Sequence, residues 1–418
     1  MLDIKLIRES EEKIKEALLK RMAPEDLDLG AILALDDKRK EVIQKVEELK
    51  SERNKFSKTK PDAETIARMK SLGEEIASLD KDLAKIELDF SEKMLALPNI
   101  PADDVISGGK ENNEVVYTFG ELPKFNFTPK DHVELATSLD IIDYERAAKM
   151  SGSGFWIYKG AGALLEWALL SYFIDFHNAN GYTFIIPPFL LNEASATASG
   201  HLPKFRDDLF WTEDKLCLNA TSEMMLGNYH RDEILSEEEL PHKYFAYSAC
   251  FRREAGSYRK EERGMIRGHQ FNKIEMFQYT RPEESWSAFD DMRSQAEKLL
   301  AGLGLHFQTS KLAAGDCSAA MAKAVDLEVW IPSMEFYIEV ISVSNALDYQ
   351  CRRGAMRFKS KETGKTEFMH TLNGSGLATS RLLPAILEQF QQEDGSVIVP
   401  EALRRFMPNN LSVISVKK

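Results

Sequence analysis

Residues 250–280 read CFRREAGSYRKEERGMIRGHQFNKIEMFQYT, and this stretch decides the fold that we predict. Apolar and aromatic residues before Arg252 and from Phe271 onward predict two strands joined by a highly charged loop. An arginine at a strand end can hold a phosphate and a carboxylate together through its planar fork of donors. Phe271 offers a ring face for a purine, and Glu275 can bind an amino group or a hydroxyl. The alternative is a salt-bridged hairpin whose tip, Arg259 to Arg263, is solvated.

Three further stretches carry polar groups that could complete a nucleotide site. HTLNGSGLATSRLLPAILEQFQQEDG, residues 370–395, predicts a glycine-rich turn and an amphipathic helix, whose amino terminus suits an anion and whose Arg381 could reach a phosphate. In FYIEVISVSNALDYQCRRGAMRF, Glu339 and Ser342 are close enough to share one Mg²⁺ with nucleotide phosphates. LCLNATSEMM, residues 216–225, suits a small polar substrate, although on local evidence the start of a capped helix explains it better.

Strand-like runs surround these stretches and set the expected fold class. YTFIIPPFLL, KYFAYSACFR, FNKIEMFQYT, VDLEVWIP and FYIEVISVS are rich in β-branched and aromatic residues. Several follow one another without a helix between them, which predicts an antiparallel or mixed sheet flanked by helices, hence an α+β domain over residues 106–418. The sequence holds no GxGxxG after a strand and no Walker A pattern, so nucleotide binding must use another device.

The first hundred residues are of another kind and predict long helices. Apolar residues step by three and four along a heptad seam at Met69, Leu72, Ile76, Leu79, Leu83, Ile86 and Phe90. Val42, Val46, Leu49 and Phe56 keep this rhythm upstream, and between the seams Pro61 disfavours helix while Asp62 can cap the next one. We therefore expect an antiparallel coiled-coil hairpin over about residues 30–95, within a domain of residues 1–105. With arms of about 30 residues it would reach about 45 Å; an ordinary helical bundle is the alternative.

Charge is uneven within this hairpin. Between Lys38 and Lys60, nine basic residues face four acidic ones, a net charge of +5 in a chain whose net charge is −13. A solvated helix face explains this composition as well as a surface that tracks phosphates does.

Composition excludes several other classes of protein. The 418 residues are 43% hydrophobic, which is enough for a large core, and the acidic balance argues against a general nucleic-acid coat protein. Cys217, Cys250, Cys317 and Cys351 form no CxxC pair, so we expect neither zinc nor a disulfide frame, as is typical of a cytoplasmic protein. The charged amino terminus resembles no targeting peptide, and no run of 18 apolar residues could span a membrane.

In the order of these features the chain resembles the bacterial-type seryl-tRNA synthetases, a family of class II aminoacyl-tRNA synthetases. The resemblance covers nearly the whole chain and includes FTPKDHVEL, GAGALLEWAL and GYTFIIPPFL. Residues 181–190 look like class II motif 1, residues 245–280 like motif 2 and residues 370–392 like motif 3. The resemblance implies a homodimeric ligase that uses ATP to make seryl-adenylate and transfers the seryl group to tRNA(Ser). It leaves open whether tRNA(Sec) is also a substrate.

The resemblance also implies roles for individual residues. Serine would be bound by Thr221, Ser222, Glu223, Arg252, Glu275, Asn373 and Ser375. ATP would be bound by Arg252, Arg253, Glu254, Gly268, His269, Gln270, Phe271, Glu339, Val340, Ile341, Ser342 and Arg381. Arg252 and Arg381 would be catalytic, and Glu339 and Ser342 would hold the Mg²⁺ that accompanies ATP. The hairpin would grip the long variable arm of the tRNA, with contacts from Arg39, Lys45 and Arg53.

Ile341 and Pro384 depart from the family pattern, and two other functions are compatible with parts of the sequence. Ile341 stands where the family usually has serine, and Pro384 lies inside the expected motif 3 helix, which it can kink. A paralogue that charges a carrier protein would lack the long hairpin. An inactive homologue would be expected to lose Arg252, Glu275 or Arg381, all of which are present.

Overall fold

The computed structural model describes residues 1–56, 62–255 and 264–416. Lys58, Lys60 and Pro61 of the expected hairpin turn, and the charged tip Arg259 to Arg263, lie outside the described residues. The chain divides into two compact units, Met1–Ile100 and Pro101–Lys418. Each unit has a hydrophobic cluster of its own.

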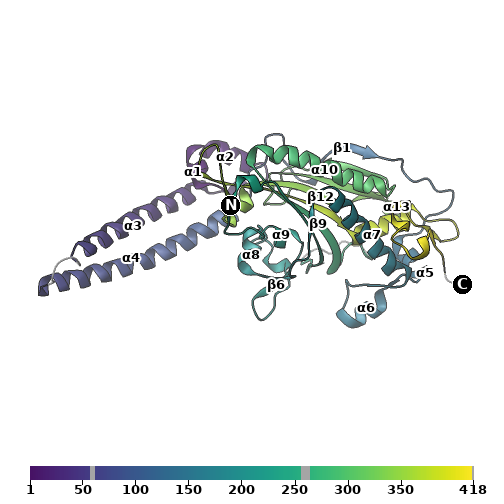
Figure 1. The fold of residues 1–418 in the computed structure, drawn as a ribbon, viewed down its shortest axis with the longest axis horizontal. Helices are drawn as coiled ribbons and strands as arrows, with labels where there is room; N and C mark the ends of the chain where they lie inside the picture. The colour runs from purple at the N-terminus through teal and green to yellow at the C-terminus, as the bar shows by residue number, and fades with distance from the viewer. Residues whose placement is uncertain (57–61, 256–263, 417–418) are drawn as a thin grey trace. The chain divides into compact units, whose positions relative to one another are not determined.

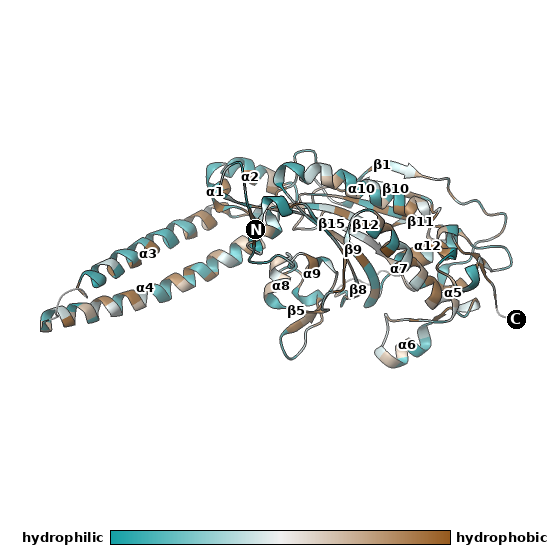
Figure 2. Cartoon of the chain, viewed as in Figure 1, coloured by the Kyte–Doolittle hydropathy of each residue, from teal (hydrophilic) through white to brown (hydrophobic). Residues whose placement is uncertain are grey.

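Two long helices, α3 (Leu29–Phe56) and α4 (Ala63–Ala96), form an antiparallel hairpin in the first unit (Figure 1). The predicted seam is confirmed, because Leu72, Ile76, Ile86 and Phe90 are the buried seam positions of α4. Hydrophilic and hydrophobic residues alternate along both helices (Figure 2), as expected when one stripe packs and the rest faces water. Asp62 accepts a hydrogen bond from the Thr65 amide and caps α4. The other elements of this unit are α1 (Ile4–Glu9), α2 (Glu11–Leu18) and a 3₁₀ turn at Pro24–Asp26.

The second unit is built on an eight-stranded sheet with the strand order β1-β10-β11-β12-β15-β9-β8-β4. Neighbouring strands are antiparallel except β4, which lies parallel to β8, so the predicted mixed sheet is confirmed. In chain order these strands are β1 (Glu114–Phe119), β4 (Thr183–Ile185), β8 (His242–Phe251), β9 (Gln270–Thr280), β10 (Phe307–Lys311), β11 (Lys323–Ile331), β12 (Phe336–Leu347) and β15 (His370–Ala378).

Helices pack on the sheet and complete the core. The three longest are α7 (Ala161–Ala179), α10 (Ser285–Gly302) and α12 (Thr379–Gln389), whose apolar residues share one buried cluster with the strands. The shorter helices are α5 (His132–Ser138), α6 (Tyr144–Ser151), α8 (Glu193–Ala198), α9 (Glu223–Leu226), α11 (Tyr349–Arg353) and α13 (Glu401–Arg404). Small sheets pair β2 (Ile142–Asp143) with β3 (Ile157–Tyr158), β5 (Leu190–Asn192) with β6 (Leu216–Leu218), β13 (Arg357–Lys359) with β7 (Ile234–Ser236) and β14 (Thr366–Phe368), and β16 (Val397–Ile398) with β17 (Val413–Ile414).

The glycine-rich stretch after residue 370 is a strand, so the prediction of a turn there was wrong. β15 pairs with β12 on one side and β9 on the other. A Cβ atom on Gly374 would lie 2.9 Å from the sulfur of Met292 and 3.2 Å from the terminal methyl of Met276. A larger residue would displace these methionine side chains, so this glycine suits the close approach of α10 to the sheet and not a turn of the chain. Arg381 is the third residue of α12.

The run YTFIIPPFLL is not one strand either. It divides into β4 and β5, which belong to different sheets, with Pro187 and Pro188 between them. Proline has no amide hydrogen to donate to a neighbouring strand, so pairing stops there. Pro384 lies within α12, which runs on to Gln389.

Two further findings concern the described residues alone. No described helix combines the length and the apolar character that crossing a membrane requires. The four cysteines are all buried, and no disulfide joins them.

Candidate active site

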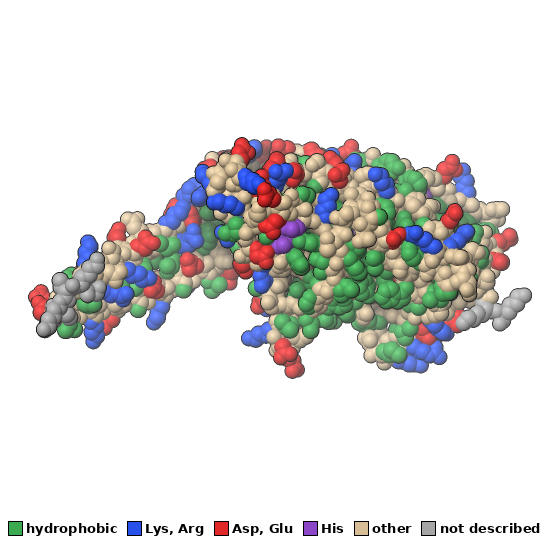
Figure 3. Space-filling model, viewed as in Figure 1, with side chains coloured by type: hydrophobic (Ala, Val, Ile, Leu, Met, Phe, Trp, Pro, Cys, Tyr) green, Lys and Arg blue, Asp and Glu red, His purple; other side chains and the backbone are tan. Residues whose placement is uncertain are grey.

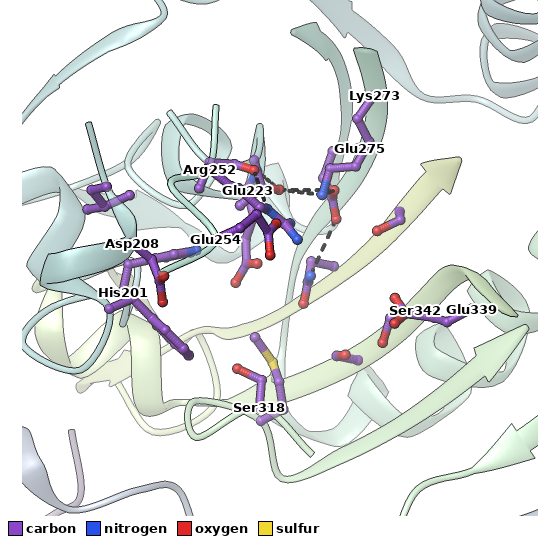
Figure 4. A pocket seen from close by; sticks show the side chains of 18 of the residues that line it. His201, Asp208, Glu223, Arg252, Glu254, Lys273, Glu275, Ser318, Glu339 and Ser342 are labelled. Carbon is purple, nitrogen blue, oxygen red and sulfur yellow. Dashed lines mark hydrogen bonds and ion pairs between the residues drawn. The ribbon is translucent and has the colours of Figure 1, made fainter. Parts of the chain in front are cut away.

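A polar cavity of about 350 Å³ lies against the central strands of the second unit, and we call it the central cavity (Figure 4). A smaller cavity of about 50 Å³, the side cavity, shares part of its lining. The shared lining residues include Arg252, Glu254, Lys273, Glu339 and Ser375, so the two cavities adjoin. The two cavities therefore belong to one site.

Strand β9 supplies one wall through alternate residues. Phe271 and Lys273 line the side cavity, while Lys273 and Glu275 line the central cavity. Residues two apart in a strand share a face, so this row follows from the local sequence QFNKIE. Across the sheet Ser375 of β15 is paired with Glu275, and Asn373 Nδ2 donates to Glu275 Oε1 at 3.4 Å. The structure thus brings together four of the residues predicted from the sequence.

Lys273 is a site residue that the sequence analysis missed. Its Nζ lies 2.5 Å from Glu275 Oε2 and 2.6 Å from the Thr221 hydroxyl, and the lysine and carboxylate side chains are 6% and 1% exposed. Thr221 in turn donates to Glu275 Oε2 at 3.2 Å. A buried carboxylate needs such a cation, because an unpaired charge is costly to desolvate. The alternation Phe271, Lys273, Glu275 was the signal that could have revealed it.

Glu223, the first residue of α9, is another acidic group that lines the central cavity. Its pKa is raised to about 7, because burial disfavours the charged form and the nearby Glu275 carboxylate repels it. Lys273 and Arg252 act in the opposite direction and lower the pKa. Two carboxylates and two cations therefore share one small volume, an arrangement that suits a substrate with both an ammonium and a carboxylate group.

Arg252 directly follows β8 and lies between the two parts of the site. Its guanidinium carbon is 5.2 Å from the centre of the Phe271 ring, and its Nε donates to the Ala220 carbonyl at 3.3 Å. Part of its fork of donors is thus oriented by the protein. A ligand aromatic ring on the same face of Phe271 would have to displace the guanidinium.

The opposite end of the site is built from β11, β12 and α12. Arg381 Nη1 donates to the Glu339 carbonyl at 2.9 Å and to its Oε2 at 3.3 Å. Ser342 is paired across the strands with Asp326, whose carboxyl is buried. Burial and the neighbouring Glu339 raise the pKa of Asp326 well above its usual range, although a hydrogen bond from Ser342 opposes this. This end gathers carboxylate and hydroxyl oxygens beside one arginine.

A close approach at Gly268 and an unusual backbone conformation at Glu254 mark the chain between β8 and β9. A Cβ atom on Gly268, which lines the side cavity, would lie 2.2 Å from the Trp156 ring, so no larger residue fits. Glu254 has a left-handed backbone with φ of 50°, and its Oε2 accepts from Arg267 Nε at 2.7 Å. Such backbone conformations are rare outside glycine and often mark ligand-binding loops.

Several residues that were predicted to contact ligands do not line either cavity in this structure. Ser222 is buried and shares a 2.7 Å hydrogen bond with Ser248. The side chain of Ile341 belongs to the hydrophobic core, so a serine there would not face the site. Arg253 and Gln270 are exposed, and His269 Nδ1 lies 3.0 Å from the Arg252 carbonyl.

The three basic residues predicted to bind tRNA are in the first unit and differ in their surroundings. Arg39 Nη2 lies 3.0 Å from the buried Asp36 carboxylate, and its guanidinium stacks on Phe90 at 4.8 Å. Lys45 is exposed, whereas Arg53 is half-buried. Arg39 therefore has a structural role in the hairpin, and Lys45 is the residue most available to a partner.

Comparison with known proteins covers both units. A model of the "tRNA synthetase class II core domain (G, H, P, S and T)" matches residues 205–390, and one of the "Seryl-tRNA synthetase N-terminal domain" matches residues 1–101. The chain is 54% identical to serine–tRNA ligase 2 of Clostridium acetobutylicum, over 97% of this chain and 99% of that one. The crystal structure of seryl-tRNA synthetase from Pyrococcus horikoshii complexed with ATP has a TM-score of 0.92 and 32% identity, with all of both chains covered. Cytoplasmic serine–tRNA ligase from Naegleria fowleri, in complex with AMP, has a TM-score of 0.86 and 30% identity, covering 100% of this chain and 99% of that one.

Proposed function

The chain belongs to the seryl-tRNA synthetase family and has serine–tRNA ligase activity, and from this we propose that serine occupies the central cavity while ATP extends into the side cavity. The observation that carries the proposal is the row Phe271, Lys273 and Glu275, which lines both cavities without a break. The serine carboxylate would attack the α-phosphorus of ATP, forming seryl-adenylate and releasing pyrophosphate. A ribose hydroxyl of the terminal tRNA adenosine would then take the seryl group and release AMP.

The polar groups of the central cavity suit serine in particular. Glu223 and Glu275 attract the ammonium group, and Glu275 with Asn373 and Ser375 offers hydrogen bonds to the hydroxyl. A site built to pair a hydroxyl rejects alanine, because alanine leaves those buried groups without partners. Arg252 reaches both cavities, so one guanidinium can neutralise the serine carboxylate and the α-phosphate together. No side chain needs to act as a nucleophile, because positioning and charge neutralisation supply the catalysis.

The far end of the site suits the phosphates of ATP and their Mg²⁺. Glu339 and Ser342 provide the hard oxygen ligands that Mg²⁺ prefers, and the buried Asp326 Oδ1 beside them has no hydrogen-bond partner among the described residues. The described residues include no group of three or more His, Cys, Asp and Glu side chains that could hold a metal without further ligands. This suits an ion that takes only a few protein ligands and is otherwise bound by phosphates. Mg²⁺ would neutralise phosphate charge there, and Arg381 would bind the terminal phosphate.

A comparison of serine and ATP affinities tests this division of the site. In serine-dependent ATP–pyrophosphate exchange, Glu275→Gln should raise the KM for serine at least tenfold and change the KM for ATP little, because the carboxylate faces only the central cavity. Glu328→Gln is the matched control, since this buried carboxylate accepts from Ser310 in the same sheet but lines neither cavity. Equal losses for both ligands would contradict the assignment.

We further propose that the hairpin α3–α4 binds the long variable arm of tRNA(Ser). Its exposed basic residues, such as Lys45, support contacts with an RNA backbone, which proteins read through shape and phosphates. Arg39 contacts Phe90 and Lys50 contacts Asp80, so these pairs lie opposite each other in the hairpin. The ends left by deleting residues 45–84 are therefore close together and can be joined by a short glycine linker. The shortened variant should keep amino-acid activation and lose aminoacylation through weaker tRNA binding. Normal charging by this variant would favour a protein partner for the hairpin.

A homodimer is the third proposal, and it rests on exposed apolar side chains in and around motif 1. Trp167 and Ile186 are 59% and 70% exposed, and Leu164, Phe184 and Leu190 are exposed as well. Figure 3 shows hydrophobic side chains gathered over one broad area of the second unit. Large exposed apolar patches mark interaction surfaces, and a two-fold axis would bury the same patch on both copies.

A cytoplasmic location is also proposed, because buried cysteines without disulfides suit a reducing compartment.

A further inference from the structure

Gln350, in the short helix α11, is a buried residue that hydrogen-bonds Glu223 of the proposed serine site. It is 1% exposed and lines neither cavity. Its Nε2 lies 2.8 Å from Glu223 Oε1 and 3.0 Å from the Ser199 carbonyl, and its Oε1 accepts from the Thr371 hydroxyl at 2.7 Å. One side chain therefore connects α11, α9, β15 and the end of α8.

The two ends of the Gln350 amide can be told apart by chemistry. A backbone carbonyl only accepts hydrogen bonds, so the atom that faces the Ser199 carbonyl must be the nitrogen. Both hydrogens of that nitrogen are then used, one on Ser199 and one on Glu223. Glu223 Oε1 must accept, so any proton that this carboxyl group binds resides on Oε2, and Glu223 itself lines the central cavity.

The charged groups Lys273 and Arg252 act on Glu223 electrostatically and lower its pKa. Lys273 is engaged by Glu275 and Thr221, and Arg252 projects from beyond β8. Among the described residues, Gln350 is the side chain that the structure shows hydrogen-bonded to the Glu223 carboxylate. His201, which also lines the cavity, has a pKa lowered to about 3 by burial, so it is neutral and adds no charge.

We propose that Gln350 is a positioning residue that holds Glu223 so that its second carboxylate oxygen meets the ammonium group of serine, with Thr371 fixing the amide in turn. This proposal rests on the proposed serine site. Gln350 touches no substrate, so it acts only through the geometry and charge of Glu223. The hydrogen bond from Gln350 lowers the pKa of Glu223 against the effect of burial, and thereby keeps more of the carboxylate ionised near neutral pH.

The test is a double-mutant cycle measured by serine-dependent ATP–pyrophosphate exchange. Gln350→Met, which keeps the length and removes the amide, should raise the KM for serine roughly 10- to 100-fold, the range expected for a lost hydrogen bond to a charged group. The KM for ATP should stay within about twofold. In a Glu223→Met background, which lacks the oxygen that accepts from Gln350, the same substitution should cost almost nothing.

Two further readouts separate positioning from general damage. Without the amide the pKa of Glu223 rises from about 7, so the increase of kcat/KM for serine with pH should shift to higher pH. Thr371→Val should show a smaller rise of the KM for serine and Thr371→Ser, which keeps the hydroxyl, should resemble wild type. These Thr371 variants carry the test if Gln350→Met does not fold.

The outcomes that overturn the inference are distinct from those that overturn the proposed site. An unchanged KM for serine in Gln350→Met, or the same loss with and without Glu223→Met, refutes the positioning role alone. If Glu223→Gln leaves the KM for serine unchanged, the serine-binding role proposed for Glu223 fails, and the role of Gln350 fails with it.

Discussion

Replacement of Lys273 by methionine tests whether the buried charges of the site are balanced as the structure shows. The ammonium group is 2.5 Å from Glu275 Oε2, and both side chains are almost fully buried. Lys273→Met leaves that carboxylate without its cation in the interior. Removing one partner of a buried ion pair costs about 3–5 kcal/mol of folding free energy, which for a chain of 418 residues lowers Tm by roughly 3–6 °C.

The double variant Lys273→Met with Glu275→Gln provides the internal comparison. Replacing both charges by neutral groups of similar shape is often nearly neutral, so the double variant should recover most of the lost stability. Lys243→Met on the neighbouring strand β8 is the matched control, because its ammonium lies 5.9 Å from the Tyr182 ring and lines neither cavity. Thermal unfolding followed by circular dichroism measures all three. A single variant that melts within about 2 °C of wild type, or a double variant no better than the single one, would refute the reasoning.

Activity gives a second, independent readout of the same substitution. Lys273 lowers the pKa of Glu223, so its removal should raise that pKa above about 7. Glu223 would then be largely protonated at neutral pH and would attract the serine ammonium less. Serine-dependent exchange by Lys273→Met should therefore improve relative to wild type as the pH rises from 7 to about 9. A loss of activity that is the same at every pH would show that the charge of Glu223 is not involved.

Three other predictions follow from the site, the hairpin and the apolar surface. Arg252→Ala should lower serine-dependent exchange by about 10²–10³ while leaving the fold intact, and activity within threefold of wild type would contradict its role. Lys45→Glu should weaken tRNA binding and reduce its salt dependence in filter-binding assays. Arg39→Glu should also lower the stability of the hairpin, because the ion pair between Arg39 and Asp36 is lost. Ile186→Lys should shift sedimentation toward the 47.4 kDa monomer, and wild type that sediments as a monomer at micromolar concentration would refute the dimer.

Features that depend on a local repeat could be predicted from the sequence. The seam from Leu72 to Phe90 repeats every 3.5 residues, and Asp62 stands where a capping residue is needed, so the hairpin followed from periodicity and capping alone. The long strands β8, β9, β11 and β12 each coincide with an apolar, β-branched run. Arg252, directly after β8, and Glu275, in the middle of β9, line the central cavity because these strands form its wall.

Features that depend on contacts between distant segments could not be predicted. Gly374 looks like a turn residue until Met292 of α10 is seen against it. Gln350 reads as one polar residue in a short helix, because its partners Glu223 and Ser199 are 127 and 151 residues away in the chain. That Ile341 packs in the hydrophobic core could not be predicted either, since a single sequence does not say which face of β12 meets the core.

Strand register has a consequence for any change of chain length near the site. Ser375 meets Glu275, and Asn373 meets Phe277, only because β15 and β9 are aligned at one position, with an irregularity after Ser375 before Ala378 pairs with Lys273. Side chains along a strand alternate between faces, so inserting or deleting one residue in this alignment would turn the polar row of β15 toward the opposite face. The chemistry of the site is therefore tied to the spacing of the chain as firmly as to the identity of its residues. Homologues or engineered variants should tolerate substitutions in β15 far better than a single-residue insertion or deletion.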